Sequence, residues 1–162
     1  RYETWVPLAM AERELSLAVR RPSAERLAWA RKVRAELKDP EKLTRRDVYA
    51  RETLAVAEYP ERMPVKLQAI RIGSLGVAAA PCEVFASTGM EIKARSPLQP
   101  AFVMSLANGY NGYLPTPRDH AQGGYETWLA RSSYLEVEAS EKIRDALLGL
   151  LGHVASVSAP PP

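Results

Sequence analysis

The unbroken apolar run Leu75-Gly-Val-Ala-Ala-Ala80 sets the tightest limit on how this chain can fold. It lacks the polar alternation of a strand with one solvated face, so we expect it to be buried on both faces in the middle of a sheet. A β-rich run over residues 65–72 precedes it, and Gly73-Ser74 separates the two runs. Two such runs joined by two residues predict a β-hairpin with a type II′ or I′ turn.

A helix and a further strand are predicted to follow this hairpin. Residues 84–95 fit a helix that Ser96-Pro97 ends, and residues 102–106 form another buried strand candidate. A strand, a helix and a strand in that order predict a right-handed parallel crossover. The expected fold is therefore α/β, with a mixed β-sheet that contains a hairpin and a parallel strand-helix-strand crossover, and with helices packed on the sheet.

The first 60 residues are predicted to contain one strand and two helices. Residues 13–19 alternate as a half-buried strand does, and Ser23 is a suitable N-cap for a helix that ends at Asp39-Pro40. Thr44-Arg-Arg-Asp47 resembles a capping box, which predicts the start of a second helix. This helix must end before Pro60, because the residue before a proline avoids the helical conformation.

The chain is interpreted as part of one domain. Apolar residues at helical spacing between Ile143 and Leu151 predict an amphipathic closing helix. The chain opens at Arg1 rather than Met, so we interpret it as a piece of a longer polypeptide, a partial domain. The expected organisation is a unit over residues 1–155, with a mostly helical lead-in (1–63) and a part that carries the sheet and the site (64–155), then a disordered tail (156–162).

Composition excludes several classes of protein. Of 162 residues, 46% are hydrophobic and 25% are charged, which suits a globular domain. The formal net charge is +3, but the charges are interleaved, so we expect no nucleic-acid partner. No apolar run approaches the roughly 18 residues of a transmembrane helix. Cys82 is the only cysteine, and we expect it to be a small buried hydrophobe.

Glycine, proline, asparagine and tyrosine are concentrated in Asn108-Gly-Tyr-Asn-Gly-Tyr-Leu-Pro-Thr-Pro117, shortly after the last predicted strand. Glycine and proline fix sharp backbone paths, so the phenols and the amide project from an ordered loop. Ligand sites of open α/β sheets form at the carboxyl ends of strands. Glu83 follows one such strand and the loop follows the next, so we expect Glu83 to lie near the loop.

Each candidate side chain in this region has a functional and a purely structural interpretation. Glu83 is either a metal ligand or acid–base group, or a carboxylate that interacts favourably with the N-terminus of the helix after it. Tyr113 is either a metal-bound phenolate or a packed tyrosine, and Tyr110 has the same packed alternative. Tyr125 either donates a hydrogen bond to a developing oxyanion or is an ordinary loop residue. Asn108 either orients a neighbour or makes an Asx-turn.

The sequence lacks several well-known catalytic motifs. It has no G-x-S-x-G elbow, no P-loop, no H-E-x-x-H and no paired cysteines. A zinc site needs three or four ligands, usually with histidines among them. The two histidines, His120 and His153, are poorly placed to complete one. If the chain serves a metal enzyme, we expect the other ligands to come from residues upstream of Arg1.

Four segments together resemble the neutral/alkaline non-lysosomal ceramidases, in particular the C-terminal part of the catalytic domain of bacterial members. The resemblance covers about residues 64–150 and is weaker over the first 60 residues. The segments are Leu67-Gln-Ala-Ile-Arg-Ile-Gly73, Ala80-Pro-Cys-Glu-Val-Phe85, Leu106-Ala-Asn-Gly-Tyr-Asn-Gly-Tyr-Leu-Pro-Thr-Pro117 and Gly123-Gly-Tyr-Glu126.

The resemblance implies a role for individual residues. In that family two histidines, a glutamate and a tyrosine bind zinc, and the family motifs place the last two at Glu83 and Tyr113. A further tyrosine, twelve residues on, contacts the scissile amide, and Tyr125 keeps that spacing. Asn108 and Tyr110 are the substrate-binding candidates. The zinc histidines and a serine motif are expected in the remainder of the catalytic domain, so this chain alone is expected to be inactive.

The activity that the resemblance implies is zinc-dependent hydrolysis of the N-acyl amide of ceramide, which gives sphingosine and a fatty acid. It also suggests a secreted, periplasmic or membrane-surface protein. Two departures from the family pattern, Cys82 in place of glycine and Thr-Trp-Leu-Ala-Arg131 after Glu126, leave a different N-acyl lipid or amide open as the substrate. The alternative is a non-catalytic binding or scaffold module that keeps the fold.

Overall fold

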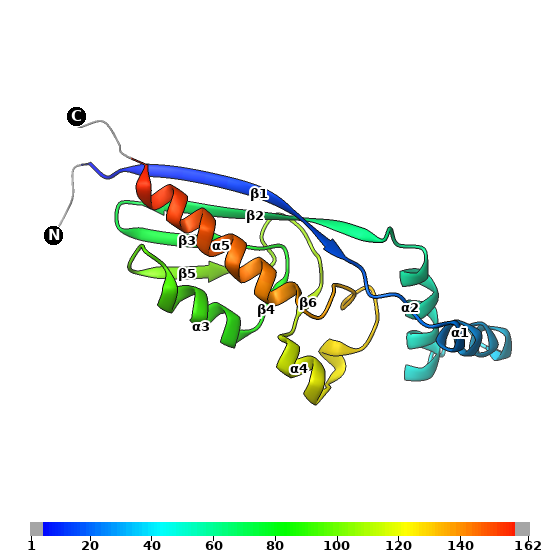
Figure 1. Ribbon diagram of the computed structural model, residues 1–162. Coiled ribbons are helices and arrows are strands. Elements are labelled where there is room, and N and C mark those ends of the chain that lie inside the picture. The colour runs from blue at the N-terminus through cyan, green and yellow to red at the C-terminus, as the bar shows by residue number, and fades with distance from the viewer. Residues whose placement is uncertain (1–4, 158–162) are drawn as a thin grey trace.

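The computed structural model describes residues 5–157 and has the mixed α/β architecture that the sequence predicts (Figure 1). The main sheet has the strand order β1-β2-β3-β5, and a small second sheet pairs β4 with β6. In the main sheet β1, β2 and β3 are antiparallel, whereas β5 runs parallel to β3. The strands are β1 (Leu8–Ala18), β2 (Arg62–Ile72), β3 (Leu75–Ala79), β4 (Glu83–Val84), β5 (Ala101–Met104) and β6 (Tyr113–Leu114).

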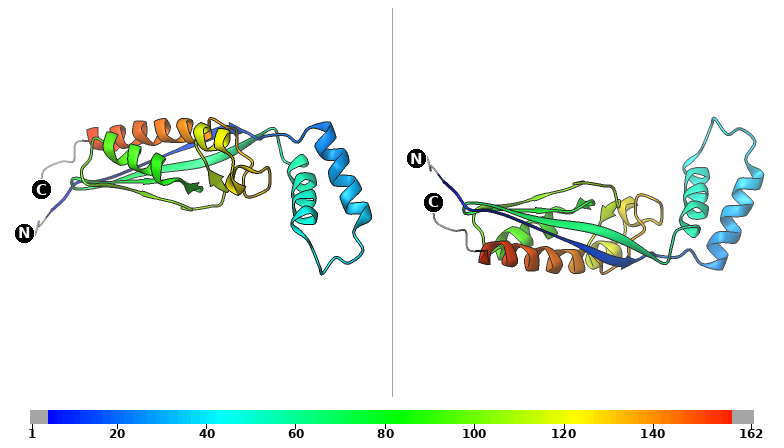
Figure 2. Two further views of the ribbon diagram at one scale, coloured as in Figure 1. Left: turned by 90° about the horizontal axis from the view of Figure 1, so that it is seen from below. Right: turned by 90° about the horizontal axis from the view of Figure 1, so that it is seen from above.

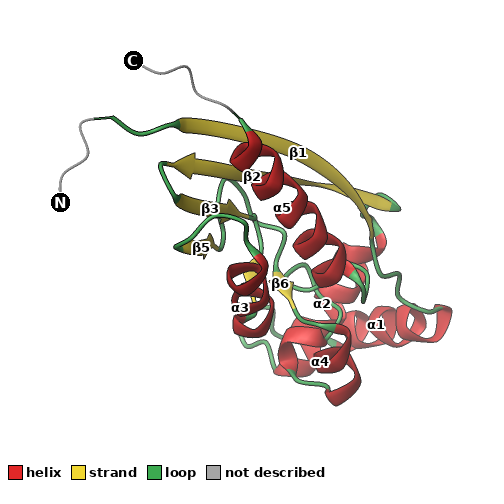
Figure 3. Cartoon of the chain, turned by 60° about the vertical axis from the view of Figure 1, so that its left-hand side comes forward, coloured by secondary structure: helices red, strands yellow, loops and turns green. Residues whose placement is uncertain are grey.

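Helices cover one face of the sheet and extend it at one end. The long helix α5 crosses the sheet with α3 beside it, and the antiparallel pair α1 and α2 projects from one end (Figures 1 and 3). None of the helices within residues 5–157 has the length and apolar character needed to cross a membrane. The helices are α1 (Ala24–Glu36), α2 (Arg45–Ala57), α3 (Ala86–Arg95), α4 (Pro117–Gln122) and α5 (Ala139–Ser156), with a short 3-10 helix η1 (Tyr125–Thr127).

The core lies between α5 and the helix-covered face of the sheet. Ile143, Leu147 and Leu151 recur at helical spacing along α5, and all three are fully buried. They join Leu17 of β1 and Leu67 of β2 in one hydrophobic cluster, which also includes residues of β3 and α3. The amphipathic closing helix expected from the sequence is therefore the element that holds the sheet.

The opposite face of the sheet carries no helix of the described chain, as the edge-on views show (Figure 2). It is apolar near the start of β1 and charged farther along, where Glu12, Glu14 and Lys66 lie on the same face. Strand register places Leu8 and Met10 of β1 on this face, followed by Ile72 of β2 and by Phe102 and Met104 of β5. Their exposed fractions run from 42% for Phe102 to 69% for Leu8. We call these five residues the open face. Contiguous exposed apolar surface of this kind marks an interaction surface.

The hairpin and the parallel crossover are confirmed. Ile72 pairs with Leu75 across the two-residue loop, and Gly73 has a φ of 63°. A positive φ at the first loop position alone is the type II′ turn. Strand β3 lies between β2 and β5, and its residues from Gly76 to Ala79 are buried, as its lack of alternation predicts.

Both predicted caps are present. The Ser23 side chain accepts a hydrogen bond from the Arg26 amide at the start of α1. Thr44 and Asp47 form the reciprocal capping box that begins α2. Each pattern depends on residues three apart in sequence, so neighbouring side chains alone determine where these two helices begin.

The differences from the predicted elements lie at boundaries and in short segments. Strand β1 begins at Leu8 instead of residue 13, because apolar side chains on the open face hide the alternation there. The helix expected from residue 84 begins at Ala86, since Glu83–Val84 forms β4. Strand β6, helix α4 and η1 were not predicted. Helix α5 includes Ser156, and residues 158–162 of the expected tail lie outside the described residues.

Candidate functional site

Glu83 and Tyr113 lie directly opposite one another in the parallel pair of β4 and β6. The Glu83 amide donates to the carbonyl of Gly112 at 2.9 Å, and the Tyr113 amide donates to the carbonyl of Ser132 at 2.8 Å. Facing residues of a two-stranded sheet project their side chains from the same face. The proximity of Glu83 to the tyrosine-rich loop, expected from the carboxyl-end rule, is therefore confirmed.

The backbone around this pair is fixed by turns at both strands. Gly112 has a φ of 77°, and a Cβ atom there would lie 2.4 Å from the carbonyl oxygen of Ser132. Only glycine fits this place, because the position is both left-handed and in contact with another backbone. On the other side, the Leu106 amide donates to the Cys82 carbonyl and the Ala107 amide donates to that of Ala80, both at 3.0 Å.

Tyr125 packs against Tyr113 although twelve residues separate them. Their rings meet edge to face, with centroids 5.7 Å apart and an interplanar angle of 86°. Side-chain hydrogen bonding with Tyr113 raises the pKa of Tyr125, and the charge of Glu126 adds to the effect. Tyr125 is 56% exposed, and its hydroxyl stays protonated at neutral pH.

Arg20 holds the segment that follows Tyr125. Its guanidinium donates to the carbonyls of Thr127, Leu135 and Ser133 at 2.8 to 3.0 Å, and also to the Ser133 hydroxyl. Burial lowers the pKa of Arg20, but the group has no carboxylate partner in the described chain and serves as a hub of carbonyl contacts. One side chain at the end of β1 thus fixes the loop between η1 and α5.

A cavity of about 330 Å³ brings the pair together with a second carboxylate. Glu83 and Tyr113 line it, and so does Glu126, which was not among the predicted site residues. Its position next to Tyr125 in the Tyr-Glu motif was the available signal. The remaining lining residues are Val84, Phe85, Ser105 and Leu106.

The two substrate-binding candidates lie on different sides of this region. Tyr110 is 57% exposed and lines a separate cavity with Tyr59 and Tyr134, and its pKa is raised by partial burial and then by the charge of Glu83. Asn108 has a φ of 60°, and its side-chain amide donates to the Gln68 side chain of β2. Asn108 therefore anchors the loop to the main sheet.

Cys82 is not a reactive group of this site. Its side chain is fully buried in the main hydrophobic cluster, and burial raises the pKa of its thiol to about 12. A thiol is a good nucleophile or metal ligand only when it ionises readily. The expectation that Cys82 serves as a small buried hydrophobe is confirmed.

The donor set suits part of a metal centre. Within residues 5–157, no group of three or more His, Cys, Asp and Glu side chains is placed to hold a metal ion. Glu83 and Tyr113 offer a carboxylate and a phenol on facing residues of the same cavity. Zinc accepts carboxylate oxygen, and a bound cation favours the ionised phenol. The chemistry of the two side chains therefore suits two ligand positions of a zinc site.

No protein-family model and no curated protein sequence matches the chain. The fold is similar to that of the neutral ceramidase from Pseudomonas aeruginosa, with a TM-score of 0.58 and 17% identity over 96% of this chain. A second ceramidase structure, complexed with C2, matches 64% of this chain and 17% of its own length at a TM-score of 0.49 and 23% identity. The chain spans 30% of the Pseudomonas protein, so its fold is that of one part of a neutral ceramidase.

Proposed function

We propose that this chain is the part of a zinc-dependent amide hydrolase that supplies two metal ligands and one catalytic hydroxyl. The observation that carries the proposal is the placement of Glu83 opposite Tyr113, with Tyr125 packed against Tyr113. The family motifs assign these same three residues to the site, and the similarity of fold to neutral ceramidase supports the assignment.

Each residue has a distinct task in the proposed reaction. Glu83 and Tyr113 would hold zinc, which would supply the activation of water and the polarisation of the amide carbonyl. Tyr125 donates its hydroxyl proton in a hydrogen bond to the carbonyl oxygen as negative charge develops on it. Arg20 is a positioning residue, because it fixes the carbonyl of Thr127 and thereby the short helix on which Tyr125 lies.

The substrate that fits this proposal is ceramide or a related N-acyl lipid, cleaved to a sphingoid base and a fatty acid. The enzyme type is that of an N-acylsphingosine amidohydrolase. The departure at Cys82 is buried away from the cavity, whereas Trp128, in the altered stretch after Glu126, is exposed beside η1. Of the two departures, the segment after Glu126 is therefore the one that a ligand can reach.

The remainder of the catalytic domain is the proposed partner of the open face. Covering Leu8, Met10, Phe102 and Met104 would remove apolar surface from water, and since these side chains are 42–69% exposed, each would contribute roughly 1–2 kcal/mol. The same remainder would bring the missing zinc ligands to Glu83 and Tyr113. One further layer of protein would thus both complete the zinc site and cover the open face.

The zinc content of variants tests directly whether Glu83 and Tyr113 are metal ligands. In the full-length protein that contains this chain, Glu83→Gln and Tyr113→Phe should each greatly lower the zinc-to-protein ratio after dialysis. Glu61→Gln and Tyr59→Phe are the matched controls, because Glu61 is exposed on the surface and the Tyr59 ring packs on Tyr134 away from the cavity. Unchanged zinc in both site variants would refute the assignment.

Activity then separates the enzyme from its alternative. A panel of N-acyl lipids and simple amides identifies the substrate of the full-length protein, and Tyr125→Phe should lower kcat while zinc content is kept. If the full-length protein binds no zinc and hydrolyses none of the panel, the chain belongs to a non-catalytic binding or scaffold module with this fold.

A further inference from the structure

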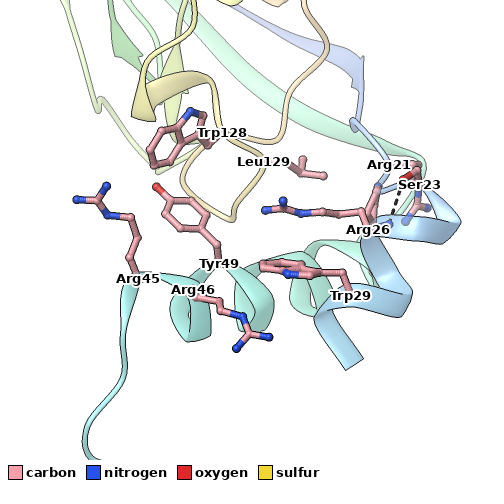
Figure 4. Close-up of a pocket in the computed structure, with 10 residues that line it drawn as sticks. Arg21, Ser23, Arg26, Trp29, Arg45, Arg46, Tyr49, Trp128 and Leu129 are labelled. Carbon is pink, nitrogen blue, oxygen red and sulfur yellow. Dashed lines mark hydrogen bonds between the residues drawn. The ribbon is translucent and has the colours of Figure 1, made fainter. Parts of the chain in front are cut away.

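A second, larger cavity lies between the helix pair and the segment after η1 (Figure 4). Its volume is about 710 Å³, within the range of small-molecule sites. Helices α1 and α2 form one wall, and Trp128 and Leu129 form the other. We call it the arginine–tryptophan pocket; it is lined by Arg21, Pro22, Ser23, Arg26, Trp29, Arg45, Arg46, Tyr49, Trp128 and Leu129.

The charges in this pocket are of one sign. No acidic residue lines it, although four arginines do. Arg46 is paired with Glu36 at 3.0 Å, but Arg21, Arg26 and Arg45 form no salt bridge within the described residues. Guanidinium groups with unsatisfied N–H donors are suited to carboxylate and phosphate oxygens, which they bind in a two-pronged geometry.

Arg26 is the best placed of these groups. Its guanidinium lies 4.2 Å from the ring centroid of Trp29, and its Nε donates to the Thr53 hydroxyl at 3.3 Å. Both contacts orient the group and leave its two terminal nitrogens without a partner in the described chain. Figure 4 shows this guanidinium directed into the space between Trp29, Tyr49 and Leu129, whereas Arg45 and Arg46 point outward.

Aromatic rings provide the other half of the pocket. Tyr49 and Trp128 meet edge to face with centroids 5.2 Å apart, so the Trp128 indole is fixed although it is 41% exposed. Trp29 is half-buried on α1. Ring faces beside an oriented cation favour a ligand that has both an anionic group and an apolar body.

We propose that the arginine–tryptophan pocket binds an organic anion that carries a carboxylate or phosphate head on an apolar body. The head accepts hydrogen bonds from the terminal nitrogens of Arg26, and the body lies against Trp29, Tyr49 and Trp128. The pocket shares no lining residue with the cavity of Glu83 and Tyr113, so this site goes beyond the proposed hydrolase function. The segment from Glu126, which lines the first cavity, to Trp128, which lines the second, connects the two along the chain.

Isothermal titration calorimetry on the full-length protein tests this proposal with four probes below their aggregation limits. Dodecanoate and dodecyl phosphate carry the two candidate heads, 1-dodecanol has the same body without charge, and inorganic phosphate has charge without a body. Saturable binding of dodecanoate or dodecyl phosphate, at least about tenfold tighter than that of both single-feature probes, supports the proposal, and the tighter of the two identifies the head. Equal affinity for dodecanol overturns it.

Matched variants then locate the binding. Arg26→Gln should weaken binding of the preferred anion by about tenfold or more, and Arg26→Lys should restore only part of it, because lysine lacks the planar fork. Arg31→Gln removes the same charge from an exposed position of the same helix outside the pocket and should leave binding unchanged. If Arg31→Gln weakens binding as much as Arg26→Gln, or if neither does, the pocket is not the site.

Discussion

Glu83 faces Tyr113 across a two-residue parallel ladder, and thirty positions of sequence separate them (113 − 83 = 30). Their proximity arises because β3 and β5 run parallel, so the segments that follow them leave the same edge of the sheet. The short ladder then holds the carboxylate and the phenol on one face. A site that depends on this geometry should be sensitive to changes in the backbone beneath it.

Gly112→Ala tests that sensitivity. The new methyl group would meet the Ser132 backbone, and the φ of 77° adds strain, so we expect a loss of about 3 kcal/mol of unfolding free energy together with weaker zinc retention. Gly123→Ala is the control, because Gly123 has a φ of 83° but nothing within 4 Å of an added Cβ. It should lose only the strain of that backbone conformation, about 1–2 kcal/mol and less than Gly112→Ala loses, as chemical denaturation would show. Equal losses would contradict the role given to the Ser132 contact.

Arg20 should be more important for order around Tyr125 than an ordinary surface arginine. Arg20→Met removes the guanidinium donors to the carbonyls of Thr127, Ser133 and Leu135, so we expect a loss of about 2–3 kcal/mol and faster amide exchange in the loop from residue 127 to 135. Arg20→Lys keeps the charge but cannot reach three carbonyls at once, so it should recover less than half of the loss. Amide exchange rates that stay at the wild-type value in both variants would contradict this role of Arg20.

The contact of Glu52 with Arg131 should make a pH-dependent contribution to the free energy of unfolding. Arg131 donates to both of its carboxylate oxygens at 2.7 and 2.8 Å, and these hydrogen bonds hold the pKa of Glu52 below its ordinary value of 4.5. Glu52→Gln should cost about 1 kcal/mol at pH 7, a modest figure because Arg131 is half exposed and the pair is screened by solvent.

The sign of the pH effect follows from the lowered pKa. The stabilisation by Glu52 is complete above the unfolded-state pKa and is lost as the pH falls through the lower folded-state pKa. The difference in unfolding free energy between wild type and Glu52→Gln should therefore shrink as the pH falls below about 4. Urea unfolding at several pH values measures it, and a constant difference would show that the ion pair is not its source.

Substitutions on the open face should destabilise the full-length protein more than substitutions at exposed helix positions. In the full-length protein, Met10→Lys combined with Met104→Lys should lower stability by about 3 kcal/mol or more, because both side chains would then meet a packed layer. Ala35→Lys with Gln122→Lys adds the same charge at exposed positions of α1 and α4 and should change the Tm little. If the first pair is tolerated as well as the second, the open face lies in water in the whole protein.

Local signals accounted for much of the fold. The Gly73-Ser74 turn, the Ser23 cap and the Thr44–Asp47 capping box each depend on neighbouring residues, and all three were predicted correctly. The proximity of Glu83 and the tyrosine-rich loop was also predictable, because strand direction alone places both at one edge.

The parts that escaped prediction depend on contacts between distant segments. Strands β4 and β6 have two residues each and carry no periodicity. Arg20 in Arg-Arg-Pro has no sequence signal for its carbonyl contacts more than 100 residues away. The arginine–tryptophan pocket likewise forms only when Trp128 meets Tyr49 of α2. Sites of this kind can be recognised only once the three-dimensional fold is known.

The most direct test of the central claim is an anomalous scattering map at the zinc absorption edge, from crystals of the full-length protein. We predict one zinc peak about 2.0–2.2 Å from a Glu83 carboxylate oxygen and the same distance from the Tyr113 hydroxyl oxygen, with the Tyr125 hydroxyl facing the open coordination position. A zinc peak that lies elsewhere, or a fully formed domain in which Glu83 and Tyr113 contact only protein groups, would contradict the account.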